Sequence, residues 1–101
     1  MIRYGDLIAG FKKGVITLGE EPYGNATVCW IGDNWFHFTD SEYDYSPSEY
    51  MADYGYRFVA ERVYAALNDV DGFAGLQSSD PDEYAYYEAV LREAGCMGHI
   101  A

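Results

Sequence analysis

Basic residues are scarce in this chain and are missing from two long stretches of it. The 101 residues include 6 Lys and Arg against 17 Asp and Glu, a formal net charge of -11 at pH 7. No Lys or Arg stands between Lys13 and Arg57, or from Val63 to Leu91. Such a field repels nucleic acid and anionic membranes and attracts cationic surfaces. We therefore expect no direct binding of nucleic acid or membranes, and a basic surface on another macromolecule as the partner.

Cysteines and long apolar segments are also rare. Cys29 stands inside an apolar segment and Cys96 near the C-terminus, a pattern that gives no disulfide framework, so both are expected to be free thiols. No segment approaches the roughly 20 apolar residues of a membrane-spanning helix, and no leader pattern opens the chain. The expected location is the cytoplasm.

The glycine and histidine patterns of most catalytic and metal sites are absent from the sequence. A nucleophile elbow, a phosphate loop and a dinucleotide fingerprint each need a glycine pattern that the chain lacks. Among the histidines, only His99 has a ligand-type neighbour at ligand spacing, Cys96. We therefore expect no catalytic residues, no metal and no cofactor. The alternative that remains open among catalytic and metal-binding functions is a small enzyme or metal protein.

A calcium site between residues 40 and 51 can be tested against the EF-hand pattern. Asp40, Glu42 and Asp44 alternate as calcium ligands do. An EF-hand loop needs glycine at its sixth position and glutamate at its twelfth. Counted from Asp40, these positions hold Tyr45 and Met51. The pattern therefore does not support a calcium site.

The apolar content is high enough for a folded protein despite the charge. Half of the residues are hydrophobic and 18% are aromatic, far from the composition of disordered chains. A chain of this length can build one hydrophobic core. We expect residues 1–101 to form a single domain.

The first half of the chain predicts a short helix followed by three strands. Ile2 to Lys13 has one apolar helical face and is followed by Gly14, a typical helix stop. Apolar or alternating segments then predict strands at 15–18, 26–31 and 35–39. Phe36 and Phe38 should share one face of the third strand, and Trp35, His37 and Thr39 the other. The Asp33-Asn34 pair is expected to supply the positive φ angles of the hairpin turn.

The second half predicts two helices. Ser46-Pro47-Ser48-Glu49 is a strong start signal, and the apolar spacing continues to about Asn68, with a kink or break at Gly55. Residues 71–79 are expected to form a loop. Asp80-Pro81 starts the last helix, which Gly95 ends. The predicted fold is α+β, with a helix, a three-stranded antiparallel sheet, and two helices packed on the sheet.

Acidic and aromatic residues alternate in two segments, which we identify as the candidate partner-binding surface. In an extended segment at 40–44 the carboxylates would lie about 6.8 Å apart on one side. Rows of carboxylates can occupy a groove that binds phosphates, and tyrosines are typical interface anchors. The candidate residues are Asp40, Glu42, Tyr43, Asp44, Tyr45, Glu49, Tyr50 and Asp53 in the first segment, and Asp80, Asp82 and Glu83 in the second.

The element order, size and acidity together resemble the small type II-A anti-CRISPR proteins, which mimic DNA on the nuclease Cas9. The phrase Asn34-Trp35-Phe36-His37-Phe38-Thr39-Asp40 is similar to the Trp-Phe-x-x-x-Asp segments of acidic antirestriction proteins. Neither resemblance assigns contact residues. Both imply a counter-defence protein of a phage or mobile element, acting in the bacterial cytoplasm without a cofactor. The implied partner is the basic nucleic-acid-binding cleft of a CRISPR-Cas nuclease or a restriction enzyme.

Two binding functions therefore remain open from the sequence, besides the alternative of a small enzyme or metal protein. The first is an acidic DNA mimic that blocks a nuclease, whose binding should weaken as salt rises. The second is a general interaction module of a phage or mobile element, in which acidity serves solubility and binding uses an apolar or aromatic patch.

Overall fold

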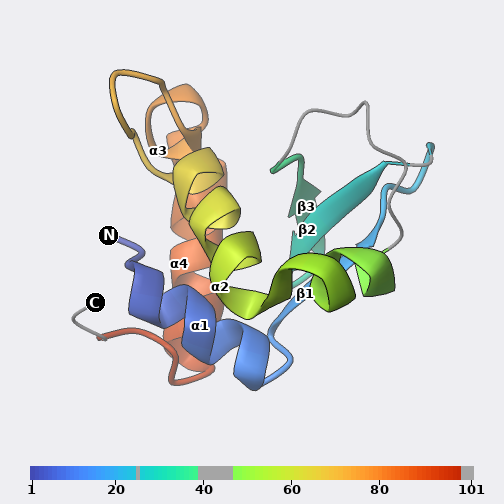
Figure 1. The fold of residues 1–101 in the computed structure, drawn as a ribbon. Coiled ribbons are helices and arrows are strands. Elements are labelled where there is room, and N and C mark those ends of the chain that lie inside the picture. Colours follow the sequence, from blue (N-terminus) through green and yellow to red (C-terminus); the bar gives the residue numbers. More distant parts are fainter. Residues whose placement is uncertain (25, 39–46, 99–101) are drawn as a thin grey trace.

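The elements follow one another in the predicted order. The computed structural model describes residues 1–24, 26–38 and 47–98, and at 47–54 and 56 it describes the backbone alone. These residues form α1 (Tyr4–Lys12), β1 (Ile16–Glu20), β2 (Thr27–Ile31), β3 (Asn34–Phe36), α2 (Pro47–Leu67), α3 (Leu76–Ser79) and α4 (Pro81–Glu93) (Figure 1). The predicted α+β class is confirmed.

The sheet turns one face toward the helices. Its strand order is β1-β2-β3, and both neighbouring pairs are antiparallel. Ile16 lies opposite Ile31 and Cys29 opposite Phe36, so these four side chains share a face. All four are buried in one core cluster with residues of three helices, among them Leu7 and Phe11 of α1, Val59, Val63 and Leu67 of α2, and Tyr84, Tyr87 and Leu91 of α4. Phe38 belongs to the same cluster, as its position relative to Phe36 predicts.

The hairpin between β2 and β3 corrects the sequence prediction in two respects. Ile31 pairs with Asn34, so the turn consists of Gly32 and Asp33. The positive φ belongs to Gly32, at 66°, and not to the Asp33-Asn34 pair, because glycine has no Cβ to clash in that conformation. The third strand ends at Phe36, before the predicted end at residue 39. His37, the next residue, bonds the Glu21 side chain.

The two long helices begin and break where the sequence predicts. α2 starts at Pro47, and Gly55 interrupts it with a φ of 75° and a ψ of 176°, so that its two halves run in different directions (Figure 1). The Asp80 side chain caps α4 by accepting the Glu83 backbone N–H at 3.2 Å. Gly95, with a φ of 74°, follows the last turn. Within the described residues, no helix is both long enough and apolar enough to span a membrane.

The segment 71–79, predicted as a loop, contains the short helix α3. The Asp69 carboxylate accepts hydrogen bonds from the Gly75 N–H, at 2.8 Å, and from the Ser78 hydroxyl. These bonds, that of Ser78 first, hold the pKa of Asp69 below its ordinary value of 3.8. One turn of helix has too few residues for an apolar period, so the sequence pattern could not reveal it.

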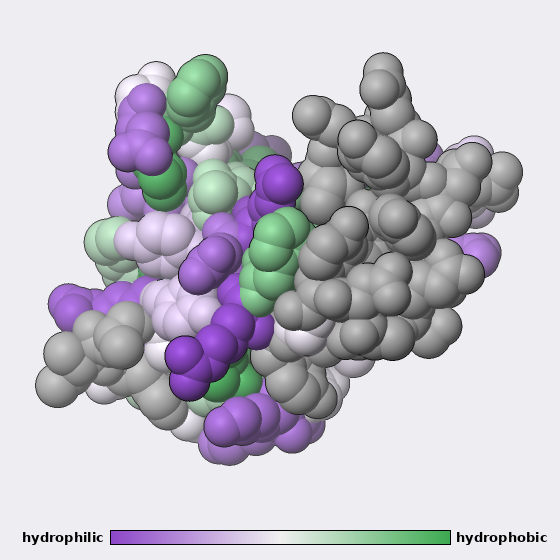
Figure 2. All heavy atoms as spheres, in the orientation of Figure 1, coloured by the Kyte–Doolittle hydropathy of each residue, from purple (hydrophilic) through white to green (hydrophobic). Residues whose placement is uncertain are grey.

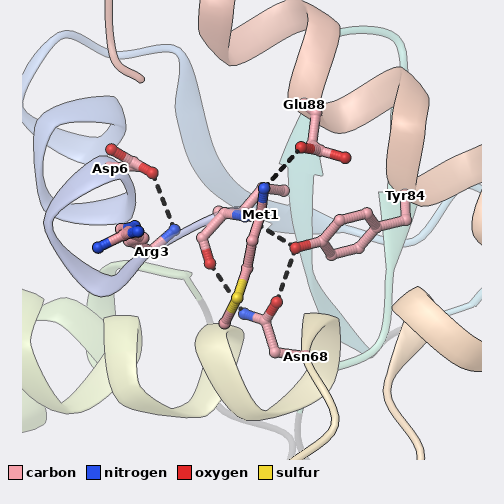
Figure 3. A network of polar contacts seen from close by, with 7 residues as sticks. Met1, Arg3, Asp6, Asn68, Tyr84 and Glu88 are labelled. Atoms are coloured by element: carbon pink, nitrogen blue, oxygen red, sulfur yellow. Dashed lines mark hydrogen bonds and ion pairs between the residues drawn. The ribbon is translucent and has the colours of Figure 1, made fainter. Parts of the chain in front are cut away.

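A buried polar network joins the N-terminal segment to α2 and α4 (Figure 3). The Tyr84 hydroxyl accepts the Ile2 N–H at 2.8 Å and donates to Asn68 Oδ1 at 2.7 Å. Asn68 Nδ2 donates in turn to the Ile2 carbonyl at 3.1 Å. Nearby, the amino group of Met1 lies 3.0 Å from Glu88 Oε2. Every group in this ring of three residues has a partner, which burial requires.

Gly10 allows α1 to approach the sheet closely, and replacing it by alanine should destabilise the fold. A Cβ at this position would lie 2.6 Å from Ile16 Cδ1 and 2.7 Å from Ile16 Cγ1. Although alanine favours a helix by about 1 kcal/mol, we expect Gly10→Ala to lower the free energy of unfolding by about 1–3 kcal/mol through overpacking. Urea denaturation measures this effect. In an Ile16→Ala background the same change should be neutral or stabilising, and equal losses in both backgrounds would contradict the explanation.

Candidate protein-interaction surface

Aromatic side chains gather on the face of the sheet opposite the main core. Trp30 pairs with Trp35 across β2 and β3, and their ring centroids lie 6.5 Å apart at an interplanar angle of 47°. The His37 ring meets Trp35 edge-on at 5.5 Å, and its Nε2 lies 2.8 Å from Glu21 Oε2. Trp35 and His37 thus share a face, as predicted. Both tryptophans are only partly exposed, so the face offers aromatic surface in fixed positions.

A glycine in the neighbouring strand makes room for one of these rings. A Cβ on Gly19 would lie 2.9 Å from Trp30 Cδ1 and Nε1, so the indole lies directly over this residue. Trp30 Nε1 donates to the Glu20 carbonyl at 3.4 Å. Because Gly19 has no Cβ, the Trp30 ring can lie close to the backbone of β1.

Beside Trp35, the β2–β3 turn and the start of α4 enclose a shallow hollow. Its volume is about 450 Å³, and its lining residues are Asp33, Asn34, Trp35, Asp80 and Glu83. Three of the five lining side chains are carboxylates, and they come from segments that contain no Lys or Arg. The hollow thus combines concentrated negative charge with the edge of an aromatic face.

Neighbouring residues bond the carboxylates of Asp80 and Glu83 and the backbone of Asp33. Glu83 Oε1 accepts the Tyr87 hydroxyl at 2.6 Å, and Asp80 accepts the Glu83 N–H. The Asp33 N–H donates to the Tyr86 hydroxyl at 3.0 Å. Burial and the bond to Glu83 raise the pKa of Tyr87 above its ordinary value of 10.0, so that its hydroxyl keeps its proton also in mildly alkaline solution. The carboxylates of Asp80 and Glu83 are therefore positioned before any partner arrives.

The basic residues belong to other parts of the fold. Three of the six lie at α1: Arg3 before it, Lys12 within it and Lys13 directly after it. The others are Arg57 and Arg62 in the second half of α2 and Arg92 in the last turn of α4. Hydrophilic side chains extend across the α1–α2 face in Figure 2. Lys13 Nζ donates to the Ala94 and Gly95 carbonyls at 3.2 and 3.3 Å, where it complements the C-terminal dipole of α4. The strands and the start of α4 thus contain no Lys or Arg.

The structure places only part of the predicted surface. Asp40, Glu42, Tyr43, Asp44 and Tyr45 lie outside the described residues, as does the proposed extended row at 40–44. Glu49, Tyr50 and Asp53 fall in the first half of α2, where the backbone alone is described. Asp80, Asp82 and Glu83 form the start of α4. Of these three, Asp80 and Glu83 line the hollow, and Asp82 is exposed on the same turn.

Three residues of the hollow, Asp33, Asn34 and Trp35, are not among the residues predicted from the sequence. The strand alternation already separated Trp35 from the core residues Phe36 and Phe38, and this was a usable signal. No signal in the sequence indicates that the hairpin turn packs against the start of α4, because 46 positions separate Asn34 from Asp80.

No protein-family model matches the chain, and neither the curated proteins nor the solved structures include a significant match.

Proposed function

We propose that the protein is a non-catalytic DNA mimic that occupies the nucleic-acid-binding cleft of a host defence nuclease, in the first place a CRISPR-Cas effector such as Cas9. The observation that carries this proposal is the hollow that Asp33, Asp80 and Glu83 line together with Trp35. Clefts that bind nucleic acid use Lys and Arg for phosphates and planar groups for bases. Carboxylates that line a hollow together with an indole can engage both kinds of group.

The distribution of charge supports the same proposal. The net charge of -11 and the two base-free stretches give the sheet and the start of α4 a consistently negative field. Charges of this kind mainly raise the association rate, while buried anchors determine how long a complex lasts. The partner needs a basic cleft, and the protein itself needs no cofactor.

Affinity capture from bacterial lysate tests the proposal when salt and duplex DNA are varied. We expect nucleic-acid enzymes among the captured proteins, released by high salt and by added DNA because both compete for the basic cleft. Asp33→Asn/Asp80→Asn/Glu83→Gln should reduce this capture several-fold. Asparagine at position 80 retains the helix cap, so the variant should fold.

The matched control is Glu61→Gln/Asp71→Asn/Glu93→Gln, which neutralises three exposed acidic residues elsewhere. Both triple variants have a net charge of -8 instead of -11, and the control should capture nearly as well as the wild type. Equal losses in both variants would mean that net charge matters and the hollow does not. Capture that resists both salt and DNA would contradict the DNA-mimic function.

The alternative, a general interaction module, has one observation in its favour. The Phe73 side chain is 79% exposed, beyond a turn in which Asp71 and Gly72 both have positive φ, and Figure 2 shows hydrophobic atoms at the end of the molecule where α2 and α3 meet. An exposed aromatic residue on a fixed turn can anchor a contact that salt hardly affects. Salt-resistant capture that Phe73→Ser abolishes would support this function instead.

A further inference from the structure

We infer that the Trp30–Trp35 face of the sheet, together with the adjoining hollow, is a docking surface for arginine side chains of a basic protein partner. This inference rests on the proposed function and deepens it, because it names the group of the partner that is recognised. Three features of the described surface support it: the aromatic planes, the carboxylates of the hollow and the charge around them.

The aromatic planes suit a flat cation. Trp30 and Trp35 are tilted by 47° and are not stacked face to face, and each remains partly exposed. Tryptophan is the best aromatic partner for a cation over its ring, and the guanidinium group of arginine also stacks on aromatic faces. The same rings could interact with nucleobases, but the surrounding negative charge repels a polyanion.

The carboxylates suit the same group. Asp33, Asp80 and Glu83 line one hollow beside Trp35, and within the described part of the chain no three His, Cys, Asp or Glu side chains are placed to hold a metal ion. Carboxylates distributed around a hollow of about 450 Å³ can accept the several N–H donors of a guanidinium group. Arginine binds carboxylates through two parallel hydrogen bonds, whereas the lysine ammonium acts as a point charge.

Charge complementarity favours a protein segment that carries arginine. No Lys or Arg occurs in residues 14–56 or 63–91, which include the whole sheet and the start of α4. These segments contribute no Lys or Arg to the surface, so a cationic side chain of a partner would complement its carboxylates. Recognition of arginine over lysine follows from ring stacking and from bidentate bonding, since the two side chains carry equal charge.

The intrinsic fluorescence of the protein provides a direct test. Trp30 and Trp35 are the two tryptophans of the chain, and both lie on this face, so tryptophan emission reports binding there. Purified protein is titrated with oligoarginine and with oligolysine of equal length at matched ionic strength. We expect oligoarginine to bind between about 2-fold and about 30-fold tighter, the range of a cation-to-ring contact. Equal affinities would overturn the inference.

Variants make the test specific to the site. Trp35→Leu should reduce the preference for arginine and keep Trp30 as the reporter, whereas Trp35→Phe, which retains an aromatic ring, should preserve more of it. The Asp33→Asn/Asp80→Asn/Glu83→Gln variant should weaken binding of both peptides. An unchanged arginine preference in Trp35→Leu, or a fluorescence response to a DNA oligonucleotide equal to that of oligoarginine, would overturn the inference.

This titration is independent of any nuclease. Salt-sensitive and DNA-sensitive capture combined with equal peptide affinities would refute the arginine site and leave the proposed function standing. Arginine preference without capture of a nucleic-acid enzyme would support the site and refute the proposed function.

Discussion

Replacing Tyr84 by phenylalanine should lower the free energy of unfolding by about 2–4 kcal/mol. The Tyr84 hydroxyl serves the Ile2 N–H and Asn68 Oδ1 at once. Both residues are almost completely buried, with exposures of 0% and 1%. Removing one oxygen therefore leaves a donor and an acceptor without a partner in the interior, and each costs about 1–3 kcal/mol. Urea denaturation, followed by circular dichroism, measures the loss.

Tyr86→Phe is the matched control for this experiment. It removes the same atom two residues further along α4, but the Tyr86 hydroxyl bonds the exposed Asp33 N–H, which water can satisfy after the change. The expected loss is below about 1 kcal/mol. Similar losses in both variants would show that the ring of Ile2, Asn68 and Tyr84 stabilises the fold no more than a surface hydrogen bond does.

Stability should fall steeply when the pH rises above about 10. Burial raises the pKa of Tyr84 and of Tyr87 above the ordinary tyrosine value of 10.0 and that of the Cys29 thiol above the ordinary 9.0. In the unfolded chain these groups lose their protons near the ordinary values, whereas the folded protein retains them. The unfolded state therefore binds fewer protons in this range, and stability decreases by about 1.4 kcal/mol per pH unit for each group.

The pH range of this loss follows from the direction of the pKa shifts. The contribution is fully present below the ordinary values and is lost progressively as the pH rises toward the raised values of the folded state. Urea denaturation at several pH values from about 8 to about 11 measures the slope. Tyr87→Phe should reduce the slope of the free energy of unfolding against pH by the contribution of one titrating group. This holds whatever the substitution does to stability at neutral pH. Parallel slopes for this variant and the wild type would contradict a retained proton on Tyr87.

The element order could be predicted because its signals are local. Pro47 and Asp80-Pro81 specify helix starts through their own backbone and capping chemistry, and Gly55 and Gly95 specify a break and an end in the same way. Strand alternation correctly separated Phe36 from Trp35. Predictions were wrong where the choice depended on neighbours: Gly32 took the positive φ of the hairpin, and α3 formed because Asp69 bonds Gly75 and Ser78.

The candidate site could be predicted only in part. Asp80 and Glu83 were identified through the cluster of acidic residues that they belong to, and both line the hollow. Asp33, Asn34 and Trp35 were not identified, because their contribution depends on packing between the hairpin turn and the start of α4. Whether the predicted acidic residues at 40–45, 49, 50 and 53 extend this surface stays a prediction.

The sequence by itself determined the charge of the protein, the α+β class and the positions of the long helices, because composition and capping are properties of the chain alone. Only the tertiary structure decided which acidic residues share a surface, that a Cβ at Gly10 or Gly19 would meet a neighbouring side chain, and that Tyr84 closes a buried ring with Ile2 and Asn68. The physical reason is distance along the chain: these contacts join residues that no local pattern connects, and they exist only once the core has packed.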